Sequence, residues 1–189
     1  MSVAARILLA LAILLFPTVQ AGASEDSAWE ALRQPGAIAI MRHAVAPGTG
    51  DPSNFTLGDC STQRNLDARG REQARMIGQA FRERGIEIDR VLTSQWCRCR
   101  ETAAMLELAP VEDLPALNSF FEDRSTRDRQ TSDVKAFLES LPKGERVMLV
   151  THQVNISALT GRPTASGQVL VLKRLPDGSV DVLGDILIR

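Results

Sequence analysis

The chain contains two histidines, and each one lies at the end of an apolar segment. The run from Ala37 to Met41 is followed by Arg42 and His43, and the run "RVMLVT" is followed by His152. A neutral imidazole is a good nucleophile near pH 7, and a guanidinium is a permanently charged set of donors that suits phosphate oxygens. These residue types favour chemistry on an anion such as a phosphoryl group.

Arg98 adds a second guanidinium to this set. It lies in the first turn of a predicted helix that follows a predicted strand over residues 88–94. A helix N-terminus presents free N–H groups to anions, and open α/β sheets bind ligands beyond the carboxyl ends of their strands. If the three strands are neighbours, Arg42, His43 and His152 converge with Arg98 on a pocket for a tetrahedral dianion.

Strands alternate with helices along the chain, which predicts a three-layer α/β/α sandwich with a mostly parallel central sheet and a C-terminal hairpin. Residues 44–65 are rich in glycine, proline and polar residues, and a loop of this length inside a compact domain is usually functional. The predicted strands span 37–43, 88–94, 146–152, 167–175 and 179–189. The predicted helices span 26–34, 66–85, 97–108, 131–144 and 153–161.

Residues 1–23 have the pattern of a signal peptide, with a basic residue at Arg6, an apolar core and then small residues. Cleavage is expected after Ala21 or Ala23. The apolar core is shorter than the roughly 20 residues of a membrane-spanning helix. We therefore expect a single domain over residues 24–189, periplasmic or secreted, without stable membrane insertion after cleavage. The net charge of −1 gives no reason to expect nucleic acid as a partner.

Three cysteines, Cys60, Cys97 and Cys99, fit a disulfide in an oxidising compartment. The sequence leaves several alternatives: Cys60 bonded to Cys97 or to Cys99, a strained pair of Cys97 with Cys99, or no bridge. Metal binding by the two neighbouring cysteines is disfavoured, because no third and fourth ligand lie at zinc-like spacing.

Three blocks and one helix resemble the histidine phosphatase superfamily, which includes the phosphoglycerate mutases. "MRHA" is similar to its Arg-His-Gly signature, "SQWCRCRETA" to its Ser-x-x-x-Arg-x-x-x-Thr-Ala block, and "LVTHQVNI" to its strand that ends in histidine. The segment "NLDARGREQARMIGQAF" resembles the Leu-x-x-x-Gly-x-x-Gln-Ala helix of the family. The resemblance covers roughly residues 37–161.

The resemblance implies a role for each matched residue. His43 is expected to be the nucleophile that carries a phosphohistidine intermediate. Arg42 and Arg98 are expected to hold the phosphoryl oxygens, and a protonated His152 to complete the pocket. The arginines and histidines supply the positive charge, so no metal or organic cofactor is expected.

The chain also departs from the family pattern. Ala44 stands in place of the glycine after the histidine, and "THQ" replaces the His-Asp of the phytase branch. The proton donor of the family usually follows the second block, where Glu122 and Asp123 are the candidates and Glu122 is slightly favoured. "RHAVA" is also similar to phosphohistidine phosphatases, which act on proteins without a carboxylic acid.

We therefore expect an exported phosphoric monoester hydrolase that acts on a small-molecule or envelope-linked phosphomonoester, such as a phosphorylated envelope sugar. One alternative is a phosphohistidine or phosphoprotein phosphatase. The other is a non-catalytic phosphate-binding module on the same fold, which Ala44 and the unassigned acid keep open. The sequence predicts no oligomeric state.

Overall fold

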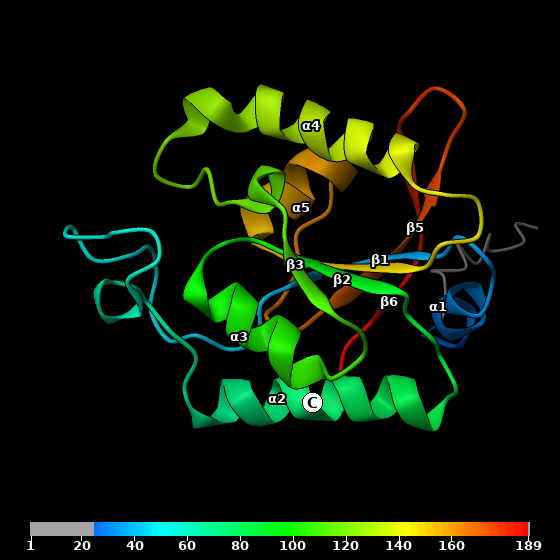
Figure 1. Ribbon diagram of the computed structural model, residues 1–189, viewed down its shortest axis with the longest axis horizontal. Helices are drawn as coiled ribbons and strands as arrows, with labels where there is room; N and C mark the ends of the chain where they lie inside the picture. Colours follow the sequence, from blue (N-terminus) through cyan, green and yellow to red (C-terminus); the bar gives the residue numbers. More distant parts are fainter. Residues whose placement is uncertain (1–24, 189) are drawn as a thin grey trace, which may run out of the picture.

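Six strands form one sheet at the centre of the molecule (Figure 1). The computed structural model describes residues 25–188, so the predicted signal peptide lies outside the described residues. Within this part of the chain, no helix is long and apolar enough to span a bilayer. The strands are β1 (Ile38–Arg42), β2 (Arg90–Thr93), β3 (Val111–Asp113), β4 (Val147–Thr151), β5 (Val169–Arg174) and β6 (Val180–Ile186).

The sheet order is β3-β2-β4-β1-β5-β6. The first four strands in this order run parallel, whereas β5 is antiparallel to β1 and to β6. Strand β4 lies between β1 and β2, so the three strands that precede the candidate residues are neighbours. The predicted α/β fold with a mostly parallel sheet and a C-terminal hairpin is confirmed.

Helices cover both faces of the sheet, which makes three layers (Figure 1). Helices α1, α2 and α3 bury their apolar side chains against one face, and α4 and α5 against the other. The helices are α1 (Glu25–Leu32), α2 (Ala68–Glu83), α3 (Cys97–Leu106), α4 (Arg127–Ser140) and α5 (Gln153–Thr160).

Strand β1 shows how the sequence builds both layers. Ala39 and Met41 point into the core under α1, α2 and α3, whereas Ile38 and Ile40 point into the core under α4 and α5. Side chains alternate between the two faces of a strand, so a central strand covered on both sides is apolar without interruption. The change from apolar to charged residues marks the end of the strand, since Arg42 is the first residue of β1 that is not fully buried.

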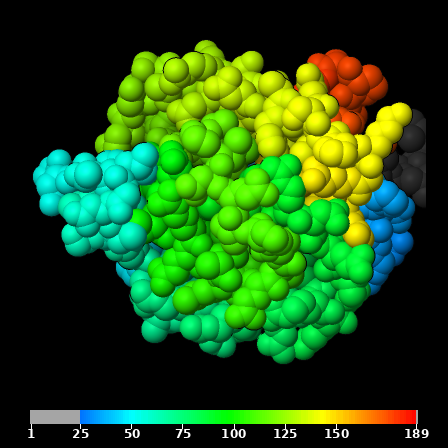
Figure 2. All heavy atoms as spheres, in the orientation of Figure 1, coloured from blue at the N-terminus to red at the C-terminus, as the bar shows by residue number. Residues whose placement is uncertain are grey.

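The long loop between β1 and α2 projects from one edge of the molecule, where Figure 2 shows it in cyan. It leaves β1 at the carboxyl end of the sheet and contains a single 3₁₀ turn, η1 (Cys60–Thr62). Two further 3₁₀ turns, η2 (Pro115–Leu117) and η3 (Arg124–Thr126), lie between β3 and α4.

Two elements differ from the sequence-based prediction. Helix α4 begins at Arg127, directly after η3, and not near residue 131. Its added residues are polar, so they lack the apolar periodicity on which the prediction depends. Strand β3 was not predicted, because all three of its residues are exposed and it pairs with β2 alone. An exposed edge strand of this length has no buried face that a sequence pattern could reveal.

Candidate active site

The two histidines lie side by side at the carboxyl ends of β1 and β4. Arg42 pairs with Thr151 in the parallel register, and the backbone N–H of His43 donates to the carbonyl oxygen of Thr151 at 2.9 Å. The ring centroids of His43 and His152 are 5.5 Å apart in an edge-to-face arrangement. Both rings line one open cleft together with Arg42 and Arg98, so the structure brings together the four residues that the sequence singled out.

His43 is held in one tautomer. Its Nδ1 lies 2.7 Å from the carbonyl oxygen of Ala44, which can only accept, so Nδ1 carries the proton. Burial, followed by the positive charge of Arg98, lowers the pKa of His43 to about 3. The ring is therefore neutral at pH 7, and its Nε2 has a lone pair available for attack on an electrophile.

His152 is neutral as well, which differs from the expected protonated form. Its Nδ1 lies 3.4 Å from an Arg98 nitrogen that can only donate, and its Nε2 lies 2.9 Å from Ser94 Oγ. Nδ1 thus accepts, and Nε2–H donates to Ser94. Burial, then the charge of Arg98, lowers the pKa of His152 well below its usual value. The sequence indicated the position of this histidine but not the desolvation that removes its charge.

Two arginines of the cleft each have a guanidinium N–H group without a hydrogen-bond partner among the described residues. Arg98 is almost fully buried, at 3% exposed, yet its Nε has no hydrogen-bond partner among the described residues. The Nε of Arg42 is likewise buried and unpartnered. Buried donors are nearly always satisfied, so two free guanidinium N–H groups in one cleft indicate an anion site.

The model of the histidine phosphatase superfamily (branch 1) matches residues 38–123, which include Arg42, His43 and Arg98. This segment, just under half of the chain, is similar to the histidine phosphatase superfamily. Several solved structures share the fold. No relative emerges among curated protein sequences.

Three solved structures illustrate the likeness, which at these identities is one of fold. A protein provisionally assigned as the phosphohistidine phosphatase SixA of Nakamurella multipartitia has a TM-score of 0.58 at 20% identity, over 80% of this chain and 95% of that one. A protein provisionally assigned as the α-ribazole-5'-P phosphatase of Escherichia coli K-12 has a TM-score of 0.58 at 17% identity, over 81% and 98%. The protein histidine phosphatase SixA complexed with tungstate has a TM-score of 0.54 at 18% identity, over 79% and 96%.

The second superfamily block owes its spacing to three separate contacts. Ser94, at the end of the strand, bonds to Nε2 of His152, and Arg98 enters the cleft from the first turn of α3. Thr102 lies one turn further along the same helix face, and its Oγ1 accepts the backbone N–H of Ala44 at 3.1 Å. The end of β2 and the helix that follows it thus position one histidine, one arginine and the backbone that follows the other histidine.

Helix α2 also contacts the backbone segment that directly follows His43. Gly70 packs so closely that a Cβ at this position would be 2.0 Å from the carbonyl oxygen of Val45. Gln73 Oε1 accepts the backbone N–H of Val45 at 3.1 Å, and its Nε2 donates to the carbonyl oxygen of Ser166 at 3.1 Å. The Gly-x-x-Gln spacing therefore serves to clamp the chain just after His43.

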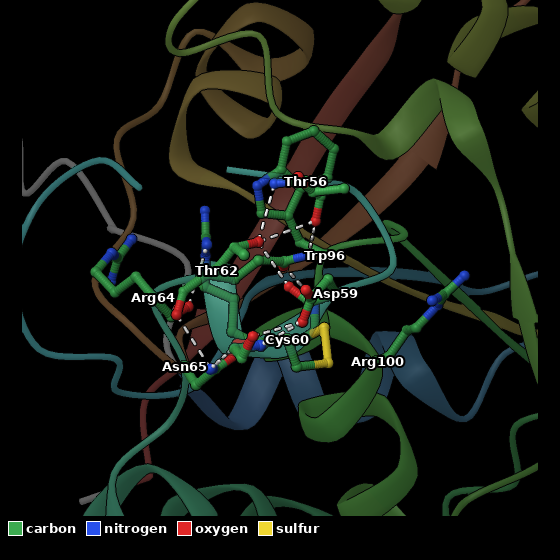
Figure 3. Close-up of a disulfide and its surroundings, with 12 residues drawn as sticks. Thr56, Asp59, Cys60, Thr62, Arg64, Asn65, Trp96 and Arg100 are labelled. Carbon is green, nitrogen blue, oxygen red and sulfur yellow. Dashed lines mark hydrogen bonds between the residues drawn. A yellow bond between two sulfur atoms is a disulfide. The ribbon is translucent and has the colours of Figure 1, made fainter. Parts of the chain in front are cut away.

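The loop is tied to α3 by a disulfide between Cys60 and Cys97 (Figure 3). This pairing decides among the alternatives that the sequence left open. Cys99 is a free, buried thiol, and burial raises its pKa to about 12. Among the described residues, no cluster of His, Cys, Asp and Glu is arranged to hold a metal ion.

The two candidate acids lie at the mouth of the cleft, and both are exposed. Asp123 accepts the backbone N–H and the hydroxyl of Ser125, and these bonds, the hydroxyl first, lower its pKa. Asp123 is thereby kept ionised as the cap of η3. Glu122 lies close to the loop instead, since a Cβ at Gly50 would be 3.1 Å from Glu122 Oε1. Of the two, it is Asp123 whose carboxylate is engaged in hydrogen bonds within its own turn.

Sequence reasoning missed two residues of the site. The carboxylate of Asp51 lies against Arg98, and Arg64 contributes a third guanidinium to the cleft wall. Both belong to the long loop, whose length was the only signal that pointed to them.

Proposed function

We propose that this protein is a phosphatase that hydrolyses phosphomonoesters through a phosphohistidine on His43. The observation that carries the proposal is the Nδ1–H bond of His43 to the carbonyl of Ala44, which leaves Nε2 unprotonated in a cleft that is also lined by two guanidiniums with free donors.

In the first step, Nε2 of His43 attacks phosphorus and the bond from phosphorus to the ester oxygen breaks. The electron pair leaves with that oxygen, which takes a proton from Glu122, and the alcohol departs. Arg42 and Arg98 neutralise the charge on the equatorial oxygens. The bond from Nδ1–H to Ala44 stabilises the positive charge that the ring acquires.

In the second step, a water molecule attacks the phosphohistidine. The bond between phosphorus and Nε2 breaks, the ring recovers its lone pair, and inorganic phosphate leaves. The proton that the water loses returns to Glu122, so the site regains its starting state.

The test is hydrolysis of a panel of phosphomonoesters in the presence of EDTA, with His43→Ala beside the wild type. We expect turnover that persists in EDTA and is lost in the variant. Rapid acid-free quenching with a ³²P-labelled substrate should trap label on the wild type only. Phosphate binding without turnover would instead indicate a non-catalytic phosphate-binding module.

We further propose that the protein works outside the cytoplasm. The signal-peptide pattern of residues 1–23 and the disulfide between Cys60 and Cys97 support this location, because disulfides persist in oxidising compartments. Phosphorylated sugars of the cell envelope are then the substrate class within reach. Fractionation of cells that produce the full chain with a C-terminal tag tests the location, and tag confined to the cytoplasm would contradict it.

A phosphohistidine phosphatase is the second candidate. One of the compared structures is described as a phosphohistidine phosphatase and another as a protein histidine phosphatase. The cleft, of about 1170 Å³, is wide enough for more than a small leaving group. Imidazole is a good leaving group that needs no strong acid, so Glu122→Gln would leave hydrolysis of a phosphohistidine peptide intact. Loss of that activity in Glu122→Gln would favour the phosphomonoester.

A further inference from the structure

Asp51 belongs to the long loop, and its carboxylate forms a bidentate ion pair with Arg98. One terminal guanidinium nitrogen of Arg98, Nη1, donates to Oδ1 at 2.6 Å, and the other, Nη2, donates to Oδ2 at 3.1 Å. The side chains of Arg98 and Asp51 are only 3% and 9% exposed. A two-point pair shielded from water fixes the plane of the guanidinium, which a pair on the open surface does not.

The pair uses the two terminal nitrogens of the guanidinium and leaves Nε–H available. Nη1 also donates to the carbonyl oxygen of Arg64 at 3.2 Å, and Nη2 contacts Nδ1 of His152 at 3.4 Å. Nε alone is buried without a partner. Asp51 therefore binds the two terminal nitrogens of the guanidinium, and the Nε–H group remains for a phosphoryl oxygen.

The carboxylate of Asp51 is itself held in place. The backbone N–H of Arg64 donates to Oδ1 at 3.0 Å, and Trp96 Nε1 donates to Oδ2 at 3.0 Å. Together with the two bonds from Arg98, each carboxylate oxygen accepts two hydrogen bonds. The carboxylate cannot turn away from Arg98 without leaving buried donors unsatisfied, which opposes such a movement.

The loop that carries Asp51 is anchored on both sides of it. The disulfide joins Cys60 to Cys97, the residue directly before Arg98 in α3 (Figure 3). The guanidinium of Arg64 links two parts of the loop, since its Nε donates to the carbonyl oxygen of Gly50 at 2.8 Å and its Nη1 donates to the carbonyl oxygen of Ala46. The anchors place Asp51 and Arg98 in one rigid unit.

From this geometry we propose that Asp51 is a positioning residue, which orients Arg98 so that its Nε edge faces the phosphoryl group. The inference rests on the proposed phosphatase function, and it concerns how the same site is prepared for its substrate. It differs from a blocking role, in which Asp51 would occupy the place of a phosphate and would have to leave before catalysis.

Asp51→Asn tests the inference, with Asp113→Asn as the matched control. Asp113, in β3, forms a bidentate pair with Arg100, which lies on α3 as Arg98 does. This second pair lies on the surface outside the cleft. We expect Asp51→Asn to lower kcat/KM by about 10- to 100-fold, mainly through kcat, because a misplaced group loses transition-state contacts. Tungstate should bind more weakly by a similar factor, and Asp113→Asn should stay within about twofold of wild type in both assays.

A blocking carboxylate predicts the opposite result. If Asp51→Asn hydrolyses substrate as fast as the wild type or faster, or if it binds tungstate more tightly, the positioning role is wrong. A merely structural role would lower the melting temperature and leave kcat unchanged below it, and this outcome would also overturn the inference.

An NMR measurement separates this inference from the proposed function. The ¹⁵Nε–H resonance of Arg98 should be sharp and slow to exchange in the wild type, and broadened or fast to exchange in Asp51→Asn. An unchanged resonance overturns the positioning role whether or not the enzyme turns over. A wild type that hydrolyses no phosphoester can still show an Arg98 resonance that differs from that of Asp51→Asn in the expected way. That result would refute the proposed function and would support the orientation of Arg98 by Asp51.

Discussion

Nδ1 of His43 lies 2.7 Å from the carbonyl oxygen of Ala44, so the ring is oriented by the residue that follows it in the chain. The bond needs no partner from elsewhere in the fold, and it assigns the two ring nitrogens opposite roles. His43 and His152 are the only histidines of the chain, so their protonation can be followed without interference.

We expect both histidines to stay neutral between pH 8 and pH 5. Burial and Arg98 lower the pKa of His43 to about 3, and the same causes lower the pKa of His152 well below its usual value. The ¹⁵N shifts of the imidazoles report the charge and the tautomer directly. Titration of either ring with a midpoint near 6.5 would contradict the buried, neutral arrangement.

The free energy of unfolding should fall as the pH drops from about 6.5 to 5. In the unfolded chain both histidines take up a proton near their usual pKa, whereas in the folded chain they do not. The unfolded state then binds more protons, so acid favours it, by up to about 1.4 kcal/mol per pH unit for each histidine. Urea unfolding at several pH values measures the slope.

The variant His43→Asn serves as the control for this slope, because it removes one of the two imidazoles that take up a proton on unfolding. The slope between pH 6.5 and 5 should then be roughly halved. Carboxylates with usual pKa values near 4 contribute little in this window. An unchanged slope in His43→Asn would show that His43 is not the group responsible.

Arg98→Lys should lower kcat/KM by about 100-fold although the charge is kept. A lysine is a single point donor, so it cannot bond Asp51 at two points and present a further N–H to phosphate. Arg100→Lys is the matched control, since Arg100 lies on the same helix and pairs with Asp113 outside the cleft. Steady-state kinetics of both variants decide the point, and equal effects would argue against a special role of Arg98.

Glu122→Gln should lower kcat by about 100-fold for alkyl phosphates and much less for p-nitrophenyl phosphate. General acid catalysis matters most when the leaving oxygen is strongly basic. Asp123→Asn should leave both rates nearly unchanged, because Asp123 is committed to Ser125 and caps η3. If the two variants behave alike with both substrates, neither carboxylate is the acid.

Loss of the disulfide should destabilise the protein by about 4 kcal/mol, as the chain-entropy relation gives for the sequence separation of 37 between Cys60 and Cys97. Urea unfolding of Cys60→Ser combined with Cys97→Ser measures this loss. Thiol counts on unfolded protein should give one before reduction and three after it. A count of three before reduction would rule out the bridge.

Much of the site was predictable because its main residues lie at the ends of continuous apolar strands. The run before His43 and the run before His152 predicted β1 and β4, and the helix after residue 94 placed Arg98 beside them. Period and composition are local properties, so the strands, the long loop and the mostly parallel sheet could be derived without any contact being known.

Tertiary structure decided what depends on distant parts of the chain. Only the fold could bring Asp51 against Arg98 and choose Cys97 over Cys99 as the partner of Cys60, because each of these pairs depends on the path of the long loop. Only the fold could make His152 neutral, since the charge of an imidazole depends on how much water and how many cations surround it. The sequence alone determined which groups line the cleft at the strand ends, and the packed structure determined their protonation and orientation.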